Sequence, residues 1–132
     1  CGDEVDPVIS LRHPVLWMLS GLVLLLLVAT GSVIPLVVVS EYDAADKVVH
    51  MISYFVLMVW FSGMYARRRQ APIALTLILF GIVLEFIQAQ LPYRQFDPLD
   101  LVANATGILF GLCLSLLVLS GWCQRVERVL GS

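Results

Sequence analysis

The chain has 132 residues, of which 60% are hydrophobic and 14% are charged, and its mean hydropathy is +0.93. A water-soluble domain of this size cannot solvate so apolar a surface, so the composition predicts a protein that lies in a lipid bilayer and contacts membrane lipid. The net charge of -2 gives no indication of a nucleic-acid partner, and the three cysteines show no C-x-x-C spacing typical of a disulfide framework or a zinc site.

Four apolar stretches follow one another along the chain, at about 15–39, 48–65, 72–89 and 99–122. Each is close to the roughly 20 residues that a helix needs to cross the hydrocarbon of a bilayer. The first is too long for a cleaved signal peptide and lacks its basic, acid-free start. We therefore expect an all-α, integral membrane bundle of four transmembrane helices that forms a single domain over residues 1–132.

The placement of basic residues predicts how these helices face. One side of the predicted bundle collects Arg12, Arg67, Arg68, Arg69, Arg125 and Arg128. The other side has only Lys47 and Arg94. The positive-inside rule then places both termini in the cytoplasm and the loops 40–47 and 89–98 outside. A lipidated Cys1 would place the N-terminus outside, against this orientation, so we expect that the sequence starts at Cys1 because it was trimmed. We interpret Gly131-Ser132 as a cloning remnant.

Acidic residues and a histidine open the second span, in "DAADKVVHMISYF". Asp43 and Asp46 fit the start of a helix, because acids in the first turn accept hydrogen bonds from free backbone amides and complement the helix dipole. Capping does not explain His50 and Tyr54, which share one helical face with Asp46 at four-residue spacing. A histidine in a membrane bundle more often has a structural role, but the neighbouring carboxylate makes a functional role about equally plausible here.

The third span contains Glu85, about 20 Å along the predicted helix at ~1.5 Å per residue. An ionised acid near mid-membrane costs about 2.5–3.5 kcal/mol on insertion scales, so it needs a partner or a task. Gly81 and Gln88 lie on the same helical face as Glu85. We expect Glu85 to be protonated or to pair with Lys47, His50 or Arg94, and we favour a functional role over simple hydrogen bonding between helices.

The fourth span begins with "FDPLDLVANATG". Asp97 precedes Pro98, which suits the first position of a helix, so Asp97 is the predicted N-cap. Asp100 and Asn104 follow on successive turns, and capping alone does not account for them. The pattern D-x-x-D-x-V-x-[HN] occurs both here and 54 residues earlier, which fits either two duplicated hairpins or shared capping chemistry.

Small residues also recur on the fourth span, at Ala103, Gly107 and Gly111. Such a ridge allows close approach of helix backbones in lipid. We interpret it as a packing surface, which implies that Asn104, on the same side, faces protein.

Three motifs together resemble the VanZ-like family of bacterial integral membrane proteins. They are D-K-x-x-H in "DKVVHMISYF", G-x-x-x-E-x-x-Q in "GIVLEFIQ", and R-x-x-D-x-x-D-x-x-x-N in "RQFDPLDLVAN", and they cover about residues 46–111. The resemblance implies a multi-pass protein of the bacterial cytoplasmic (inner) membrane, and the family's namesake is associated with resistance to the glycopeptide teicoplanin. It also implies a shared polar cluster formed by Asp46, Lys47, His50, Glu85, Gln88, Arg94, Asp97, Asp100 and Asn104.

The expected function is binding, with or without chemical modification, of an anionic envelope ligand from the outer side of the membrane. A lipid-linked polyprenyl phosphate or a peptidoglycan-precursor head group fits this description. The catalytic candidates are His50 with Asp46 as a general base, and Glu85. The ligand-binding candidates are Lys47, Tyr54, Gln88, Arg94, Asp97, Asp100 and Asn104. No cofactor is expected, and the residues do not decide whether the protein is an enzyme.

Three alternatives stay open. An ion-coupled transporter or channel module would use Glu85 and His50 as a proton relay, and four spans would then require a homo-oligomer. A structural or assembly subunit would use the polar residues to clasp its helices together. A divalent metal site at Asp46, His50, Glu85 and Asp100 is the weakest reading, because one histidine and scattered carboxylates fix no ligand geometry, so no metal is predicted.

Overall fold

The computed structural model describes residues 9–34 and 43–131, and these fold into helices without any strand. Four long helices follow one another: α1 (Pro14–Val33), α2 (Asp43–Met64), α3 (Gln70–Gln88) and α4 (Pro98–Leu114). The short 3-10 helix η1 (Arg67–Arg69) precedes α3. The short π-helix η2 (Ser115–Leu119) continues α4. The last helix is α5 (Trp122–Leu130). The predicted all-α bundle is confirmed, with four helices long and apolar enough to cross a membrane.

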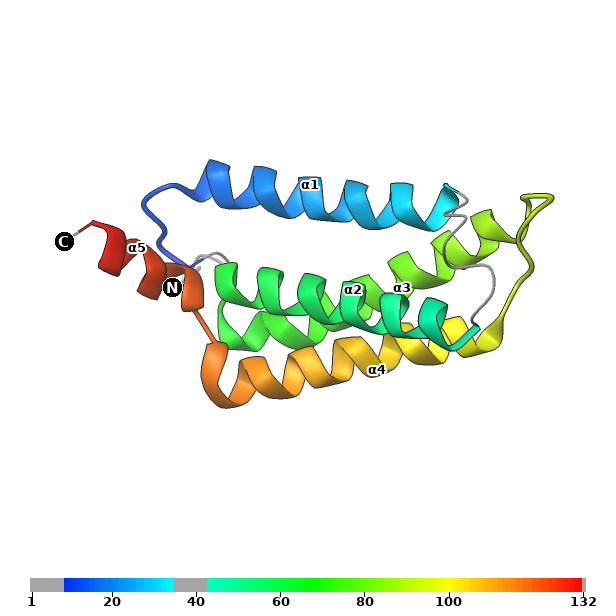
Figure 1. The fold of residues 1–132 in the computed structure, drawn as a ribbon. Helices are drawn as coiled ribbons and strands as arrows, with labels where there is room; N and C mark the ends of the chain where they lie inside the picture. The colour runs from blue at the N-terminus through cyan, green and yellow to red at the C-terminus, as the bar shows by residue number, and fades with distance from the viewer. Residues whose placement is uncertain (1–8, 35–42, 132) are drawn as a thin grey trace, which may run out of the picture.

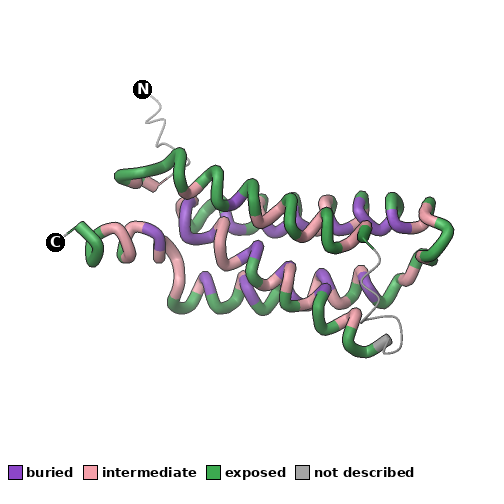
Figure 2. The backbone as a smooth tube through the Cα atoms, turned by 45° about the horizontal axis from the view of Figure 1, so that its top comes forward, coloured by how far each residue is buried: buried purple, intermediate pink, exposed green. Residues whose placement is uncertain are grey.

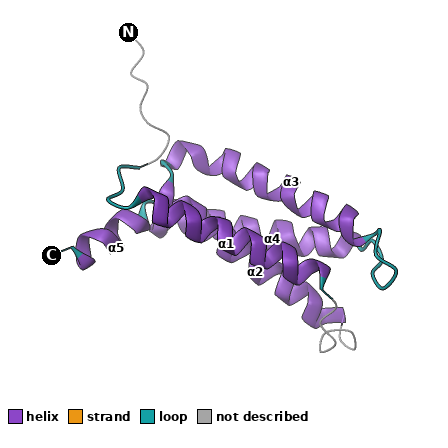
Figure 3. Cartoon of the chain, turned by 90° about the horizontal axis from the view of Figure 1, so that it is seen from above, coloured by secondary structure: helices purple, strands orange, loops and turns teal. Residues whose placement is uncertain are grey.

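Successive long helices run in opposite directions, so α2 and α4 run parallel to each other (Figure 1). The start of α1, the turn η1 and helix α5 lie at one end of the bundle, and the α3–α4 loop lies at the other (Figure 3). The six arginines assigned to one side of the membrane thus belong to segments at one end of the bundle, as the four-span arrangement requires.

The helix boundaries differ from the predicted spans at three places. Helix α1 ends at Val33, because Ile34 adopts extended backbone angles, and 35–39 lie outside the described residues. Helix α2 starts at Asp43 rather than at 48, since polar residues form its first turns; the side chain of Asp43 lies outside the described part, so its capping role stays a prediction. The fourth span stops before Trp122, which instead begins α5, because Gly121 has a φ of 68° and breaks the helix.

The tightest contact in the bundle joins α2 and α4. A Cβ atom on Gly107 would collide with the backbone carbonyl of Met51, and one on Gly111 would lie 2.8 Å from the Cβ of Met58. Only glycine allows the two backbones to come this close. The predicted role of the small-residue ridge as a packing surface is therefore confirmed.

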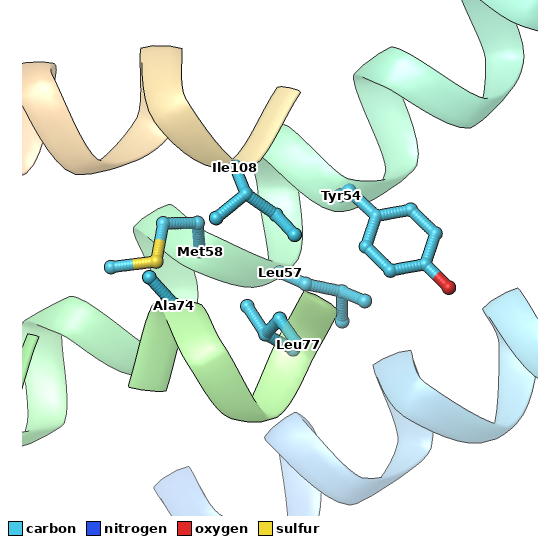
Figure 4. Packing of buried hydrophobic residues seen from close by; sticks show 6 residues of the cluster. All are labelled: Tyr54, Leu57, Met58, Ala74, Leu77 and Ile108. Atoms are coloured by element: carbon cyan, nitrogen blue, oxygen red, sulfur yellow. The ribbon is translucent and has the colours of Figure 1, made fainter. Parts of the chain in front are cut away.

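The hydrophobic core lies between α2, α3 and α4 (Figure 4). It consists of Tyr54, Leu57, Met58, Ala74, Leu77 and Ile108. Helix α1 lies at the edge of this core: Gly21 is its one buried residue, and most of its surface is exposed (Figure 2). Its exposed side chains are mostly apolar, apart from Ser20 and Thr30, as expected for a helix that faces lipid.

The end of the bundle that carries α5 is held by aromatic packing. The rings of Trp17, Trp60 and Trp122 lie 5.3–5.5 Å apart, centroid to centroid. The carboxylate of Glu127 accepts hydrogen bonds from the indole of Trp17, at 2.9 Å, and from the backbone amides of Arg12 and His13. Helix α5 is thereby joined to the start of α1.

Candidate functional site

The predicted polar residues meet at the end of the bundle opposite α5. Helices α2 and α4 run parallel and both begin there, while α3 ends there. The first turns of α2 supply Asp46, Lys47 and His50, and those of α4 supply Asp100 and Asn104. This polar cluster therefore depends on parallel packing of two segments that are 54 residues apart in sequence.

Two ion pairs tie α2 to the segment that follows α3. Lys47 Nζ lies 2.8 Å from Asp97 Oδ2 and 3.5 Å from Asp100 Oδ1. Arg94 Nη1 donates a hydrogen bond to Asp46 Oδ2 at 3.1 Å. Both basic residues of this side thus contact carboxylates of the protein itself.

Asp97 caps α4 as predicted. Its Oδ1 accepts a hydrogen bond from the Leu99 amide at 2.9 Å, and Pro98 takes the first helical position. The hydrogen-bonded ammonium of Lys47 and the Leu99 amide hold the pKa of the Asp97 carboxyl below its ordinary value. Asp97 is therefore charged at neutral pH and both caps the helix and pairs with Lys47.

His50 lies between α2 and α4 and is 7% exposed. Its Nδ1 lies 3.1 Å from the side-chain oxygen of Asn104. Because an amide oxygen only accepts hydrogen bonds, Nδ1 is the donor, and in the neutral ring Nε2 carries the lone pair. This Nε2 lies 3.9 Å from Asp46 Oδ2 and 3.9 Å from Asp100 Oδ2, which is too long for a hydrogen bond.

Glu85 has a different partner from the three that the sequence suggested. Its side chain is 1% exposed, and Oε1 accepts a hydrogen bond from the backbone amide of Asp97 at 2.8 Å. Its Oε2 has no hydrogen-bond partner, and no ion pair joins it to a described basic side chain. The expected pairing with Lys47, His50 or Arg94 is therefore absent from the described structure, and Glu85 instead fixes the start of α4.

Tyr54 and Gln88 lie beside the charged groups rather than among them. The buried Tyr54 hydroxyl has no hydrogen-bond partner among the described residues. A Cβ on Gly81 would lie 3.2 Å from this hydroxyl and 3.1 Å from Asn104 Nδ2, so the absent side chain makes room for both. Gln88 points to α1, where its Nε2 donates to the Ser32 carbonyl at 2.7 Å.

Sequence reasoning missed the part that α1 plays at this site, because α1 has no charged residue. Besides Gln88, Tyr93 reaches α1 and donates its hydroxyl to the Val33 carbonyl at 2.8 Å. Between α1 and α2 lies a groove of about 390 Å³. It is lined by Leu24, Leu27, Val28, Gly31, Ser32, Asp46, Val49, His50, Ile52, Ser53, Tyr54, Val56 and Arg94.

Three of the four residues considered for a metal site do come together. Asp46, His50 and Asp100 each offer one ligand atom, and these atoms all lie within 4.8 Å of one another. Glu85 is not part of this group. The view that the carboxylates are scattered is therefore wrong for Asp46 and Asp100, because the parallel packing of α2 and α4 brings them to the same imidazole.

Comparisons with known proteins add one relative. The chain is 33% identical over 88 residues to an uncharacterized protein of fission yeast, Schizosaccharomyces pombe, and the match covers 64% of this chain and 52% of the yeast protein. The matched part thus spans about half the length of that relative. No family model matches the chain, and no solved structure matches it. The VanZ-like resemblance and a bacterial source therefore stay predictions.

Proposed function

We propose that the polar cluster and the adjoining groove bind an anionic, lipid-linked ligand. The observation that carries this proposal is the composition of the groove along its length. Leu24, Leu27 and Val28 of α1 face Ile52 and Val56 of α2 and make it apolar. The same groove also includes Asp46, His50 and Arg94. An amphipathic molecule can therefore place a hydrocarbon chain along the helices and a charged head group at the polar end.

Arg94 is the best candidate to hold the head group. Its guanidinium contacts one described acceptor, Asp46, through Nη1. A guanidinium has five N–H donors in a planar fork, which suits a phosphate as a second partner. Lys47 contacts Asp97 and Asp100, so we assign it to positioning these carboxylates rather than to the ligand.

The VanZ-like resemblance supplies the biological setting of this proposal. The ligand is then a polyprenyl phosphate or a peptidoglycan precursor in the outer leaflet of a bacterial inner membrane, with the Arg67–Arg69 turn in the cytoplasm. A role in glycopeptide resistance belongs to the same proposal. In a version with chemistry, His50 is the general base through Nε2. The Asn104 oxygen orients its ring, and the nearby Asp46 carboxylate would stabilise the ring once it is protonated. The Glu85 contact with the Asp97 amide fits a positioning role.

Binding is tested with the purified full chain in detergent containing EDTA, titrated with a polyprenyl phosphate and with the uncharged polyprenol. Charge-assisted hydrogen bonds contribute about 1.5–3 kcal/mol, so Arg94→Gln should weaken phosphate binding roughly tenfold to a hundredfold. The control is Arg67→Gln, which changes an exposed arginine at the opposite end. Equal affinity for phosphate and alcohol, or equal effects of the two substitutions, would contradict the proposal.

The groove itself is tested with Gly31→Leu. Gly31 lines the groove and a Cβ there meets no atom within 4 Å, so a larger side chain at this position is expected to take up groove volume. Binding of a long-chain prenyl phosphate should weaken, whereas inorganic phosphate at Arg94 should be affected little. A Gly31→Leu protein that binds the long chain as well as the unchanged protein would exclude this groove as the hydrocarbon site.

A structural clasp is a second candidate, favoured by the internal pairing of Lys47, Arg94 and Glu85. It predicts loss of stability without selective loss of a ligand. The transporter alternative has less support, because no hydrogen bond between described residues links Glu85 to His50.

A further inference from the structure

We infer that Asp46, His50 and Asp100 form a binding site for one divalent metal ion of the Mn²⁺ or Zn²⁺ class. The inference goes beyond lipid binding, because the three residues would hold the ion whether or not a lipid is present. It rests on the geometry of the ligand atoms, on the state of His50, and on the charge balance of the cluster.

The separations of the ligand atoms suit one ion between them. Metal–nitrogen and metal–oxygen bonds are about 2.0–2.2 Å long, so two ligands on one ion lie between about 3 and 4.4 Å apart. His50 Nε2 lies 3.9 Å from Asp46 Oδ2 and from Asp100 Oδ2, and one ligand atom of each residue lies within 4.8 Å of those of the other two.

The contact between His50 and Asn104 prepares the imidazole for a metal. Ligating histidines in proteins regularly donate their second ring N–H to an oxygen acceptor, which fixes the tautomer and the ring orientation. Nδ1 of His50 does this with the Asn104 oxygen at 3.1 Å. The lone pair of Nε2 then faces the carboxylates of Asp46 and Asp100 and forms no hydrogen bond with either. All three groups carry electron pairs toward the same point, so a cation placed between them would stabilise the arrangement.

The charges of the cluster point the same way. Its described carboxylates are Asp46, Glu85, Asp97 and Asp100, against the permanent cations Lys47 and Arg94. Three of these acids, Asp46, Asp97 and Asp100, take part in the ion pairs, and they outnumber the two cations by one, so a cation bound there would improve the charge balance. His50 and Asp100 are only 7% and 5% exposed, so an unbalanced charge there would be costly.

The ligand set also limits the choice of ion. One imidazole with two carboxylates suits Zn²⁺ or Mn²⁺ better than soft metals, and three protein ligands leave positions open for water or another group. Asp46 and His50 line the groove between α1 and α2, which gives an ion a route to the site. A bound ion near Arg94 would add a second positive group for a phosphate.

The test uses the metal-stripped full chain in detergent, with Mn²⁺ alone and Zn²⁺ alone as probes and no lipid added. We expect one ion per chain by calorimetry and, for Mn²⁺, by electron paramagnetic resonance. His50→Gln and Asp100→Asn should each weaken binding at least tenfold. Asn104→Ala should weaken it about tenfold to a hundredfold, as loss of a supporting contact does at other sites.

The matched control is His13→Gln, which removes the other histidine of the sequence, at the opposite end of the bundle. It should leave binding unchanged. Should His50→Gln fail to fold, Asp46→Asn, at a half-buried position, takes its place in the comparison. Absence of saturable binding, or equal binding by the site variants and the unchanged protein, overturns the inference. Because no lipid is used here and EDTA is present in the lipid test, each can fail without the other.

Discussion

Glu85 near the end of α3 and Asp97 at the start of α4 are joined by one hydrogen bond, from the Asp97 amide to Glu85 Oε1, at 2.8 Å. The same Asp97 caps α4 and contacts Lys47 of α2. Three helices are therefore linked through one loop residue, and Glu85, one of the predicted catalytic residues, holds this residue in place.

Glu85→Ala should lower the free energy of unfolding by about 1–3 kcal/mol, because the Asp97 amide, in a part-buried contact, would lose its acceptor. Glu85→Gln retains one side-chain oxygen as an acceptor, so its cost should be clearly smaller. Thermal unfolding of both variants in detergent measures the difference. A larger loss in Glu85→Gln than in Glu85→Ala would show that the charge of Glu85 matters more than this contact.

Gly107→Ala should be among the most damaging small substitutions in the chain. Its Cβ would collide with the Met51 carbonyl, and the backbones of α2 and α4 would have to separate. Overpacking of this kind costs about 1–3 kcal/mol or more. Gly31→Ala is the matched control, because a Cβ there meets nothing within 4 Å. Equal melting temperatures for the two variants would be incompatible with the close contact.

Stability should fall in acid partly through Asp97. The folded pKa of this carboxyl is lowered, first by the hydrogen bond from Lys47, so its contribution is full above the unfolded pKa of about 3.9. The contribution is lost as the pH falls from there through the lowered folded value. Asp97→Asn should flatten the stability curve in this acid range, whereas Gln95→Glu, in the same loop, should not. An unchanged slope in Asp97→Asn would contradict the assignment.

Cys123 should resist thiol reagents in the folded protein. It is fully buried at the start of α5, and burial, aided by the charge of Glu127, raises the pKa of its thiol to about 12. The reactive thiolate is therefore scarce at pH 8. In a chain with Cys1 and Cys113 replaced by serine, maleimide labelling should become fast only on unfolding. Rapid labelling of the folded chain would show that α5 is not docked as described.

Local features of this chain were predictable, and distant contacts much less so. Asp97 and Pro98 form a helix start by chemistry that lies within a few residues, and the structure confirms it. The four-residue spacing of Asp46 and His50 correctly placed them on one face. The partner of Glu85 was not predictable from the sequence. It is the backbone amide of Asp97, and only the path of the loop between α3 and α4 brings that amide to the carboxylate. The VanZ-like resemblance assigned Gln88 to the polar cluster, yet Gln88 donates to a backbone carbonyl of α1 instead.

The repeated pattern D-x-x-D-x-V-x-[HN] is more informative in the structure than in the sequence. Its equivalent positions His50 and Asn104 are in direct contact, and Asp46 and Asp100 both lie 3.9 Å from the same imidazole nitrogen. Parallel neighbours with the same motif bring like residues together, which explains why two acids share one histidine. Duplication of a hairpin stays a prediction that these contacts fit.

Helix α1 is held by hydrogen bonds to other segments near its two ends and by apolar contacts along its middle. Hydrogen bonds from Gln88 and Tyr93 hold its last residues, and those to Glu127 hold its first turn. Along its middle, it contacts the core through the partly buried Leu24, Leu25 and Val28. Bowing of this helix toward the surrounding lipid would separate apolar contacts without breaking the hydrogen bonds at either end. A hydrocarbon chain that enters this groove from the membrane would therefore displace apolar contacts of α1, not its hydrogen bonds to Gln88, Tyr93 or Glu127.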